Sequence, residues 1–124
     1  IKESKLSTKY VKELIIKTAK LSTKVRMLSG GNQQKVVLAK ALASEPGIIL
    51  LDEPTRGVDV GAKSEIYRII NDLACKGFAI LVVSSELPEL LAVSDRIVVM
   101  HEGKVSGIVD AKTATESSIM QMAI

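Results

Sequence analysis

Two short stretches of this chain combine residue types that suit phosphate chemistry. In the first, Leu28 to Gln34, a serine and two glycines precede a predicted helix. Glycines let the backbone approach a ligand closely, and the first turn of a helix presents unpaired N–H groups and a positive dipole end to an anion. Ser29 adds a hydroxyl at a natural N-cap position. Alone, this stretch predicts helix capping more strongly than anion binding, because short motifs also occur by chance.

The second stretch is an apolar run that ends in two acids, Ile48 to Glu53. An unbroken run of Ile and Leu predicts a strand buried on both faces of a parallel sheet, and ligands bind such sheets beyond the carboxyl ends of the strands. Asp52 and Glu53 stand at that end. Adjacent residues on a strand point to opposite sides, so one carboxylate can bind a metal ion while the other orients a water.

The spacing of apolar residues predicts the elements that hold these stretches in place. One predicted βαβ unit has a strand at 48–53, a helix that ends before Gly77 and a second buried strand at 78–83. Two further strands joined by a turn at Gly103 predict a hairpin. The remaining predictions are a helix over about 9–18, a helix over 32–44, a short helix over 86–93, hairpin strands at 96–100 and 104–109, and a last helix capped by Thr113 or Thr115.

The bulk properties indicate one folded domain. The chain has 124 residues, of which 47% are hydrophobic and 2% aromatic, so its core is aliphatic. No apolar run reaches the length of a membrane span, and a single cysteine excludes an internal disulfide.

The net charge of +3 is unevenly distributed, because the first 26 residues carry eight Lys or Arg and two Glu. A basic segment can indicate nucleic-acid binding. Here the charges alternate with Val11, Leu14 and Ile15, which is typical of the wet face of an amphipathic helix, and Tyr10 is the only aromatic residue among them. We therefore expect no nucleic-acid partner.

The motifs resemble a known family. Leu28 to Gln33 resembles the signature sequence of ATP-binding cassette (ABC) ATPases, and Ile48 to Glu53 resembles their Walker B strand. The runs Asp52 to Lys63 and Ser84 to Glu89 are similar to the second cassette of the tandem ATPase subunits in bacterial importers of ribose, xylose, arabinose and galactose. The resemblance extends over nearly the whole chain.

The resemblance implies an α/β, P-loop NTPase-like fold of which this chain is the C-terminal portion: a mostly parallel sheet with flanking helices and a terminal β-hairpin. Residues 1–27 would be the end of the helical subdomain that contains the signature, and residues 28–124 the C-terminal part of the ATPase core. The implied cofactors are ATP and Mg²⁺, and the implied activity is ATP hydrolysis coupled to sugar import.

The resemblance also implies a role for each motif residue. The signature residues would contact an ATP held by the opposite cassette: Ser29, Gly30, Gly31, Asn32 and Gln33. On this cassette's own ATP, Asp52 would hold Mg²⁺ and Glu53 would polarise the attacking water. Asp59 would belong to the loop that couples the two sites, and Ser85 occupies the switch position.

The implied partners are a second ABC cassette in the same chain or a dimer, membrane permease subunits and, indirectly, a periplasmic sugar-binding protein. The implied location is the cytoplasmic face of the inner membrane, as a peripheral subunit.

Three departures from the family pattern bear on activity, and the phosphate-binding loop is also missing from these residues. Asn32 replaces the usual glutamine, and Arg56 to Val58 replaces a run of small residues. Ser85 stands where most ABC ATPases carry a histidine, and a serine cannot supply positive charge, so we expect hydrolysis at this site to be slow or absent. No Gly-x-x-x-x-Gly-Lys-Ser pattern occurs, since the one candidate, ending at Ser64, has Ala62 where glycine is required. The chain alone is therefore expected to be inactive.

Two other functions are compatible with these motifs. A truncated cassette could act as a non-catalytic interaction module, which the missing phosphate loop favours. An ABC ATPase of a non-transport class, such as a repair or translation factor, would be indicated by a coiled coil or basic insertion near the signature, and neither is visible.

Overall fold

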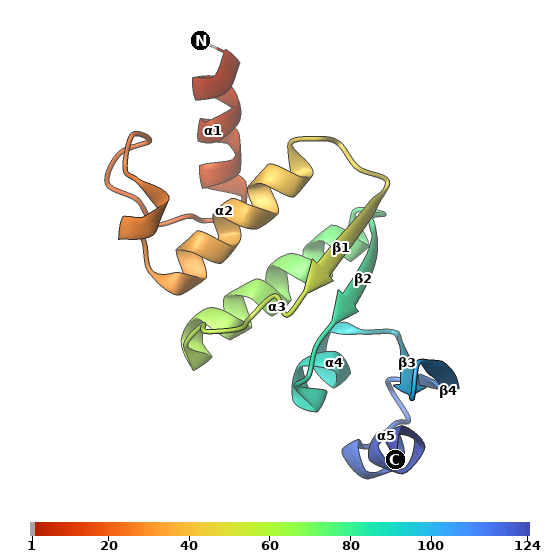
Figure 1. The fold of residues 1–124 in the computed structure, drawn as a ribbon. Coiled ribbons are helices and arrows are strands. Elements are labelled where there is room, and N and C mark those ends of the chain that lie inside the picture. Colours follow the sequence, from red (N-terminus) through yellow and green to blue (C-terminus); the bar gives the residue numbers. More distant parts are fainter. Residues whose placement is uncertain (1) are drawn as a thin grey trace.

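The computed structural model describes residues 2–124 as an N-terminal helical part, a parallel strand pair with helices beside it, and a C-terminal hairpin with its own helix (Figure 1). In chain order the elements are α1 (Lys2–Glu13), the short 3₁₀ helix η1 (Val25–Met27), α2 (Gly30–Leu42), β1 (Ile48–Asp52), α3 (Val60–Cys75), β2 (Ala79–Val83), α4 (Leu87–Val93), β3 (Arg96–His101), β4 (Lys104–Asp110) and α5 (Glu116–Ala123).

The central unit is the predicted βαβ motif. Strands β1 and β2 pair in parallel, with Ile48 opposite Ala79 and Asp52 opposite Val83, and α3 connects them. Helix α3 ends as predicted, because Gly77 follows it with a φ of +95°, in the left-handed region that favours glycine. The carboxyl ends of both strands therefore meet at one edge, which is where Asp52 lies.

The main core lies between this unit and the N-terminal helices. Buried residues from α1, the segment after it, α2, β1 and α3 form one apolar cluster: Tyr10, Leu14, Ile16, Leu38, Leu42, Ile49, Ile69 and Leu73. Each helix contributes an apolar stripe at helical spacing, so packing of these stripes fixes α2 and α3 against β1. The same core therefore holds the signature turn, Ser29 to Gly31, and the end of β1.

The prediction that β1 and β2 are buried on both faces is wrong for this structure. Ile48 and Leu50 of β1 are 64% and 72% exposed, and Leu81 and Val83 of β2 are also more than half exposed. Side chains alternate across a strand, and the helices cover only the face that contains Ile49. The outer face of the strand pair is an uncovered apolar surface within residues 2–124.

The first helix begins and ends earlier than its sequence predicts. It begins at Lys2 rather than near residue 9, and the Thr8 hydroxyl donates to the Ser4 carbonyl inside α1 at 2.8 Å instead of capping a helix. The helix ends at Glu13, and Ile15 has a φ of +52°, which redirects the chain toward α2.

The C-terminal part confirms the predicted hairpin and last helix. Strands β3 and β4 are antiparallel and form a two-stranded sheet separate from β1 and β2, with Gly103 at a φ of +76° in the turn. Thr115 caps α5 in a capping box with Ser118. Ile119 packs against Ile97 and Val99 in a small core of its own. Over residues 2–124, no helix combines the length and apolar character needed to cross a membrane.

Candidate functional site

The signature turn and the proposed coupling residue line one open cavity of about 290 Å³. Ser29 is the N-cap of α2 and Asp59 is the N-cap of α3, so two helix N-termini open toward this cavity. Asp59 caps α3 directly, because its Oδ1 accepts a hydrogen bond from the N–H of Ala62 at 3.0 Å. The structure thus brings together Ser29, Gly31, Asn32 and Asp59, which lie up to 30 residues apart in sequence.

Gly31 lines this cavity and also allows close packing between α2 and α3. It is buried, and a Cβ built on it would lie 2.6 Å from the Cβ of Ala62 on α3. Gly30 is exposed, and a Cβ there would lie 3.2 Å from the carbonyl oxygen of Gly57. The two glycines therefore let α2 approach α3 and the loop before it, which the sequence analysis did not foresee.

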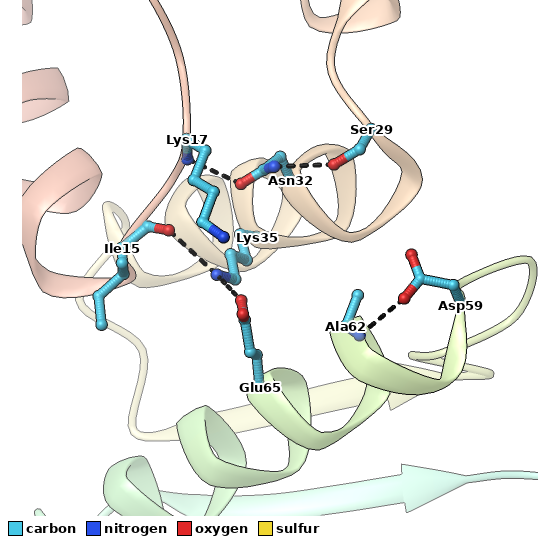
Figure 2. A network of polar contacts seen from close by, with 8 residues as sticks. All are labelled: Ile15, Lys17, Ser29, Asn32, Lys35, Asp59, Ala62 and Glu65. Carbon is cyan, nitrogen blue, oxygen red and sulfur yellow. Dashed lines mark hydrogen bonds and ion pairs between the residues drawn. The ribbon is translucent and has the colours of Figure 1, made fainter.

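The two amide side chains of the signature are both used inside the chain. The Nδ2 of Asn32 donates to the Oγ of Ser29 at 2.7 Å, and its Oδ1 accepts from the N–H of Lys17 at 2.8 Å (Figure 2). The Nε2 of Gln33 donates to the Leu28 carbonyl at 2.8 Å. The Ser29 hydroxyl accepts no capping hydrogen bond from a backbone N–H of α2, and it bonds to Asn32 instead.

A buried lysine below the signature turn was missed by the sequence analysis. Lys35 is 1% exposed, and its Nζ donates to the Ile15 carbonyl at 3.0 Å and to Glu65 at 2.6 Å (Figure 2). The hydrogen bond from Lys35 lowers the pKa of the Glu65 carboxyl. Lys35 therefore joins α2 to the segment after α1 and to α3. A lysine in a helix rich in lysine and glutamine carries no signal that would single it out.

The acidic pair at the end of β1 forms a second group with the switch position. Glu53 has a φ of +46°, its N–H donates to the Val83 carbonyl at 2.8 Å, and its Oε1 accepts from the backbone N–H of Ser85 at 2.9 Å. A non-glycine residue in this conformation is uncommon and is found at functional sites more often than elsewhere. The carboxylate of Glu53 is thus held by the backbone at position 85, whatever side chain that position carries. This second group does not line the cavity of the signature turn.

Helix α4 is fixed beside this second group by two polar contacts that the sequence did not reveal. The hydroxyl of Thr55 donates to Glu89 at 2.7 Å, and both residues are 1% exposed. The other carboxylate oxygen of Glu89, Oε2, is buried and has no partner among residues 2–124. Lys63 pairs with Glu86 at 2.7 Å, and this hydrogen bond raises the pKa of Lys63. The loop after β1, α3 and α4 are therefore connected.

Asp52 is suited to hold Mg²⁺ by its chemistry and position. Its carboxylate is exposed at the end of β1 and takes part in neither ion pair of the described residues. Over residues 2–124, no group of three or more His, Cys, Asp or Glu side chains could form a complete metal site. A lone carboxylate still fits Mg²⁺, which proteins commonly bind through one or two carboxylates together with substrate phosphates.

Comparison with known proteins identifies relatives of this sequence. Residues 3–56 match the family model described as ABC transporter. The chain is 55% identical over 122 residues to the ribose import ATP-binding protein of Bacillus subtilis (strain 168), and 55% identical over 119 residues to the xylose import ATP-binding protein of Thermoanaerobacter pseudethanolicus. These alignments cover 98% and 96% of the chain. The chain spans about a quarter of the length of these curated relatives, 25% and 24%.

Solved structures with the same fold are ABC transporter cassettes. A dimeric bacterial ABC transporter cassette aligns with a TM-score of 0.74 at 29% identity and covers 86% of this chain and 46% of its own. A second ATP-binding cassette of an ABC transporter aligns with a TM-score of 0.83 at 24% identity, over 98% of this chain and 50% of its own. A second structure of the first cassette, bound to ADP and Pi, also aligns at a TM-score of 0.74. The fold is therefore that of about half of an ABC cassette, as the sequence predicted.

Proposed function

We propose that this chain, a homologue of the ATP-binding proteins of bacterial sugar importers with the fold of an ABC ATPase, forms the C-terminal part of a cassette that couples ATP binding and hydrolysis to sugar import. The observation that carries the proposal is the division of its functional residues into two groups. Ser29 and Asp59 share one cavity, while Asp52 and Glu53 lie at the end of β1 beside Ser85. Two groups suit an ATPase in which each nucleotide lies between two cassettes.

The signature group would bind the terminal phosphate of an ATP held by the opposite cassette. The residues proposed for this contact are Ser29, Gly30, Gly31, Asn32 and Gln33, at the N-terminus of α2. The unpaired N–H groups there and the dipole of a 13-residue helix favour an anion. Asp59, at the N-terminus of α3, would couple the signature site to the hydrolytic site. It is placed to respond to a bound phosphate because Asp59 and Ser29 line the same cavity.

The second group would carry out hydrolysis on this cassette's own ATP. Glu53 would orient and polarise the attacking water through the oxygen that does not accept from Ser85, because a positioned carboxylate is what phosphoryl transfer to water requires. Asp52 would hold Mg²⁺, which neutralises phosphate charge when bound.

Residues 1–27 would form the end of the helical subdomain, and residues 28–124 would form the C-terminal part of the ATPase core. Permease subunits, a second cassette and, indirectly, a periplasmic sugar-binding protein would be its partners at the cytoplasmic face of the membrane.

The experiment that tests this function is steady-state ATP hydrolysis by the intact protein that carries this sequence. In a Ser85→His background, where turnover at this site should be raised, Glu53→Gln is expected to abolish that increase, because it removes the base while keeping the shape of the side chain. Glu116→Gln, on the exposed first turn of α5, is the matched control and is expected to retain full activity. Full retention of the increase by the variant that carries both Ser85→His and Glu53→Gln would contradict the proposal. The 124-residue chain alone is expected not to bind Mg-ATP at micromolar concentration in calorimetry.

A further inference from the structure

The direction of the hydrogen bonds around Asn32 determines what the hydroxyl of Ser29 can do. A backbone N–H can only donate, so the N–H of Lys17, at 2.8 Å, requires the oxygen of the Asn32 amide to face it. The amide nitrogen must then face the Oγ of Ser29, at 2.7 Å. An amide nitrogen can only donate, so Ser29 accepts this bond.

Acceptance of this bond leaves the single hydroxyl proton of Ser29 available. The Ser29 side chain is exposed, lines the cavity, and donates no hydrogen bond to any other group of residues 2–124 (Figure 2). A hydroxyl that accepts one hydrogen bond becomes a better donor in the next, because bonds in a chain polarise one another. The hydroxyl is therefore prepared to donate to an anionic oxygen in the cavity.

The segment that fixes Asn32 is itself anchored by the buried lysine. Lys35 lies one helical turn after Asn32 and binds the carbonyl of Ile15, while Asn32 binds the N–H of Lys17. Two side chains of α2 thus hold the same three-residue segment. Glu65, on α3, also accepts a hydrogen bond from the Nζ of Lys35. The position of the Lys17 N–H, and with it the orientation of the Asn32 amide, is set by this buried contact.

We propose that Asn32 is a positioning residue that sets the Ser29 hydroxyl as a hydrogen-bond donor to the terminal phosphate of ATP. This inference rests on the proposed function of the signature turn. The positioning role depends on the two bonds that the amide already makes, one from the Lys17 N–H and one to Ser29, and is separate from any contact that Asn32 itself makes with the nucleotide.

Asn32→Asp separates this role from a structural one. The aspartate is nearly the same shape, and one oxygen still accepts from the Lys17 N–H, but the other now accepts the Ser29 proton and turns it away from the ligand. The measurement is kcat and KM for ATP hydrolysis by the intact protein, for this variant, Ser29→Ala and the double variant. Gln34→Asp, which adds the same charge two residues later on α2, is the control for charge.

The expected loss in kcat/KM is roughly ten- to a hundredfold for Ser29→Ala, the range for removal of a hydrogen bond to a charged group, and at least as large for Asn32→Asp. In the Ser29→Ala background, Asn32→Asp is expected to lower kcat/KM by no more than Gln34→Asp does. If Asn32→Asp fails to fold by circular dichroism, Asn32→Ala replaces it, with a smaller loss that must also vanish without Ser29.

The possible results are distinguishable. Equal losses from Asn32→Asp with and without the Ser29 hydroxyl would overturn the positioning role and leave the proposed function intact. Unchanged hydrolysis by Ser29→Ala would overturn the proposed role of the signature turn, and with it this inference.

Discussion

The contact between Gly31 and Ala62 allows a quantitative test of how α2 and α3 are held together. A methyl group at position 31 would lie 2.6 Å from the Cβ of Ala62, whereas carbon atoms in contact prefer about 3.5–4.0 Å. The opposing atom belongs to an alanine, which has no rotamer by which to move away. The helices would have to separate by roughly 1 Å, and overpacking of this kind costs about 1–3 kcal/mol.

Gly31→Ala also gains up to about 1 kcal/mol of helix propensity, so the expected net loss is about 1 kcal/mol in the free energy of unfolding. The pair Gly31→Ala and Ala62→Gly isolates the contact. In the Ala62→Gly background, the nearest atoms to a new Cβ at position 31 are 3.8 Å away, so the overlap is removed. The coupling free energy between the two substitutions should therefore be favourable by at least about 1 kcal/mol.

The assay is urea denaturation of the purified protein, followed by circular dichroism, for the two single variants and the double variant. Gly61→Ala is the control, because a Cβ there would lie 3.5 Å from Asp59 Oδ1, an ordinary contact, and the variant should be neutral or slightly more stable. Additive effects of the Gly31 and Ala62 substitutions would refute the argument that this glycine is required by helix contact.

Three further predictions concern the polar contacts. Thr55→Val should lower the free energy of unfolding by about 1–3 kcal/mol, because it leaves the buried carboxylate of Glu89 without a donor, whereas Thr55→Ser should be close to wild type in the same denaturation assay. Ser85→Ala should leave ATP hydrolysis nearly unchanged, since the backbone N–H still holds Glu53, and Ser85→His should raise it; if Ser85→His has no effect while Glu53→Gln abolishes turnover, the expectation of a slow site is wrong. The bond from Lys35 lowers the pKa of Glu65, so its stabilising effect is fully present above about pH 4.3, the ordinary glutamate pKa, and is lost as the pH falls through the lowered value. Glu65→Gln should therefore lose less stability than the wild type between pH 7 and pH 3.

The local pattern of the sequence was sufficient to predict most elements. The strands, the crossover helix and the hairpin follow from alternation, helical spacing and the glycines at 77 and 103, because these signals are contained within a few residues. Asp52 ends β1, as the apolar run before it indicated, and Glu53 lies directly after the strand.

Contacts between distant segments could not be predicted in the same way. Lys35 is separated from Ile15 by 20 residues and from Glu65 by 30. The sequence around Lys35 resembles that around an exposed helical lysine. The apolar run of β1 correctly indicated a strand but not that one of its faces is uncovered, since burial depends on what else packs on the sheet. The positive φ of Glu53 likewise occurs together with hydrogen bonds to Val83 and Ser85, which are distant in sequence.

The close contact at Gly31 and the ion pair of Lys35 have a consequence for local dynamics. Together they join α2 and α3 at two successive levels, one by packing and one by charge. The amides of the two helices should therefore exchange hydrogen with similar protection, as one cooperative unit, whereas α5, in its separate small core, should open independently. A motion that displaces the signature turn would then carry Asp59 with it, so that the two ends of the cavity keep their relative positions.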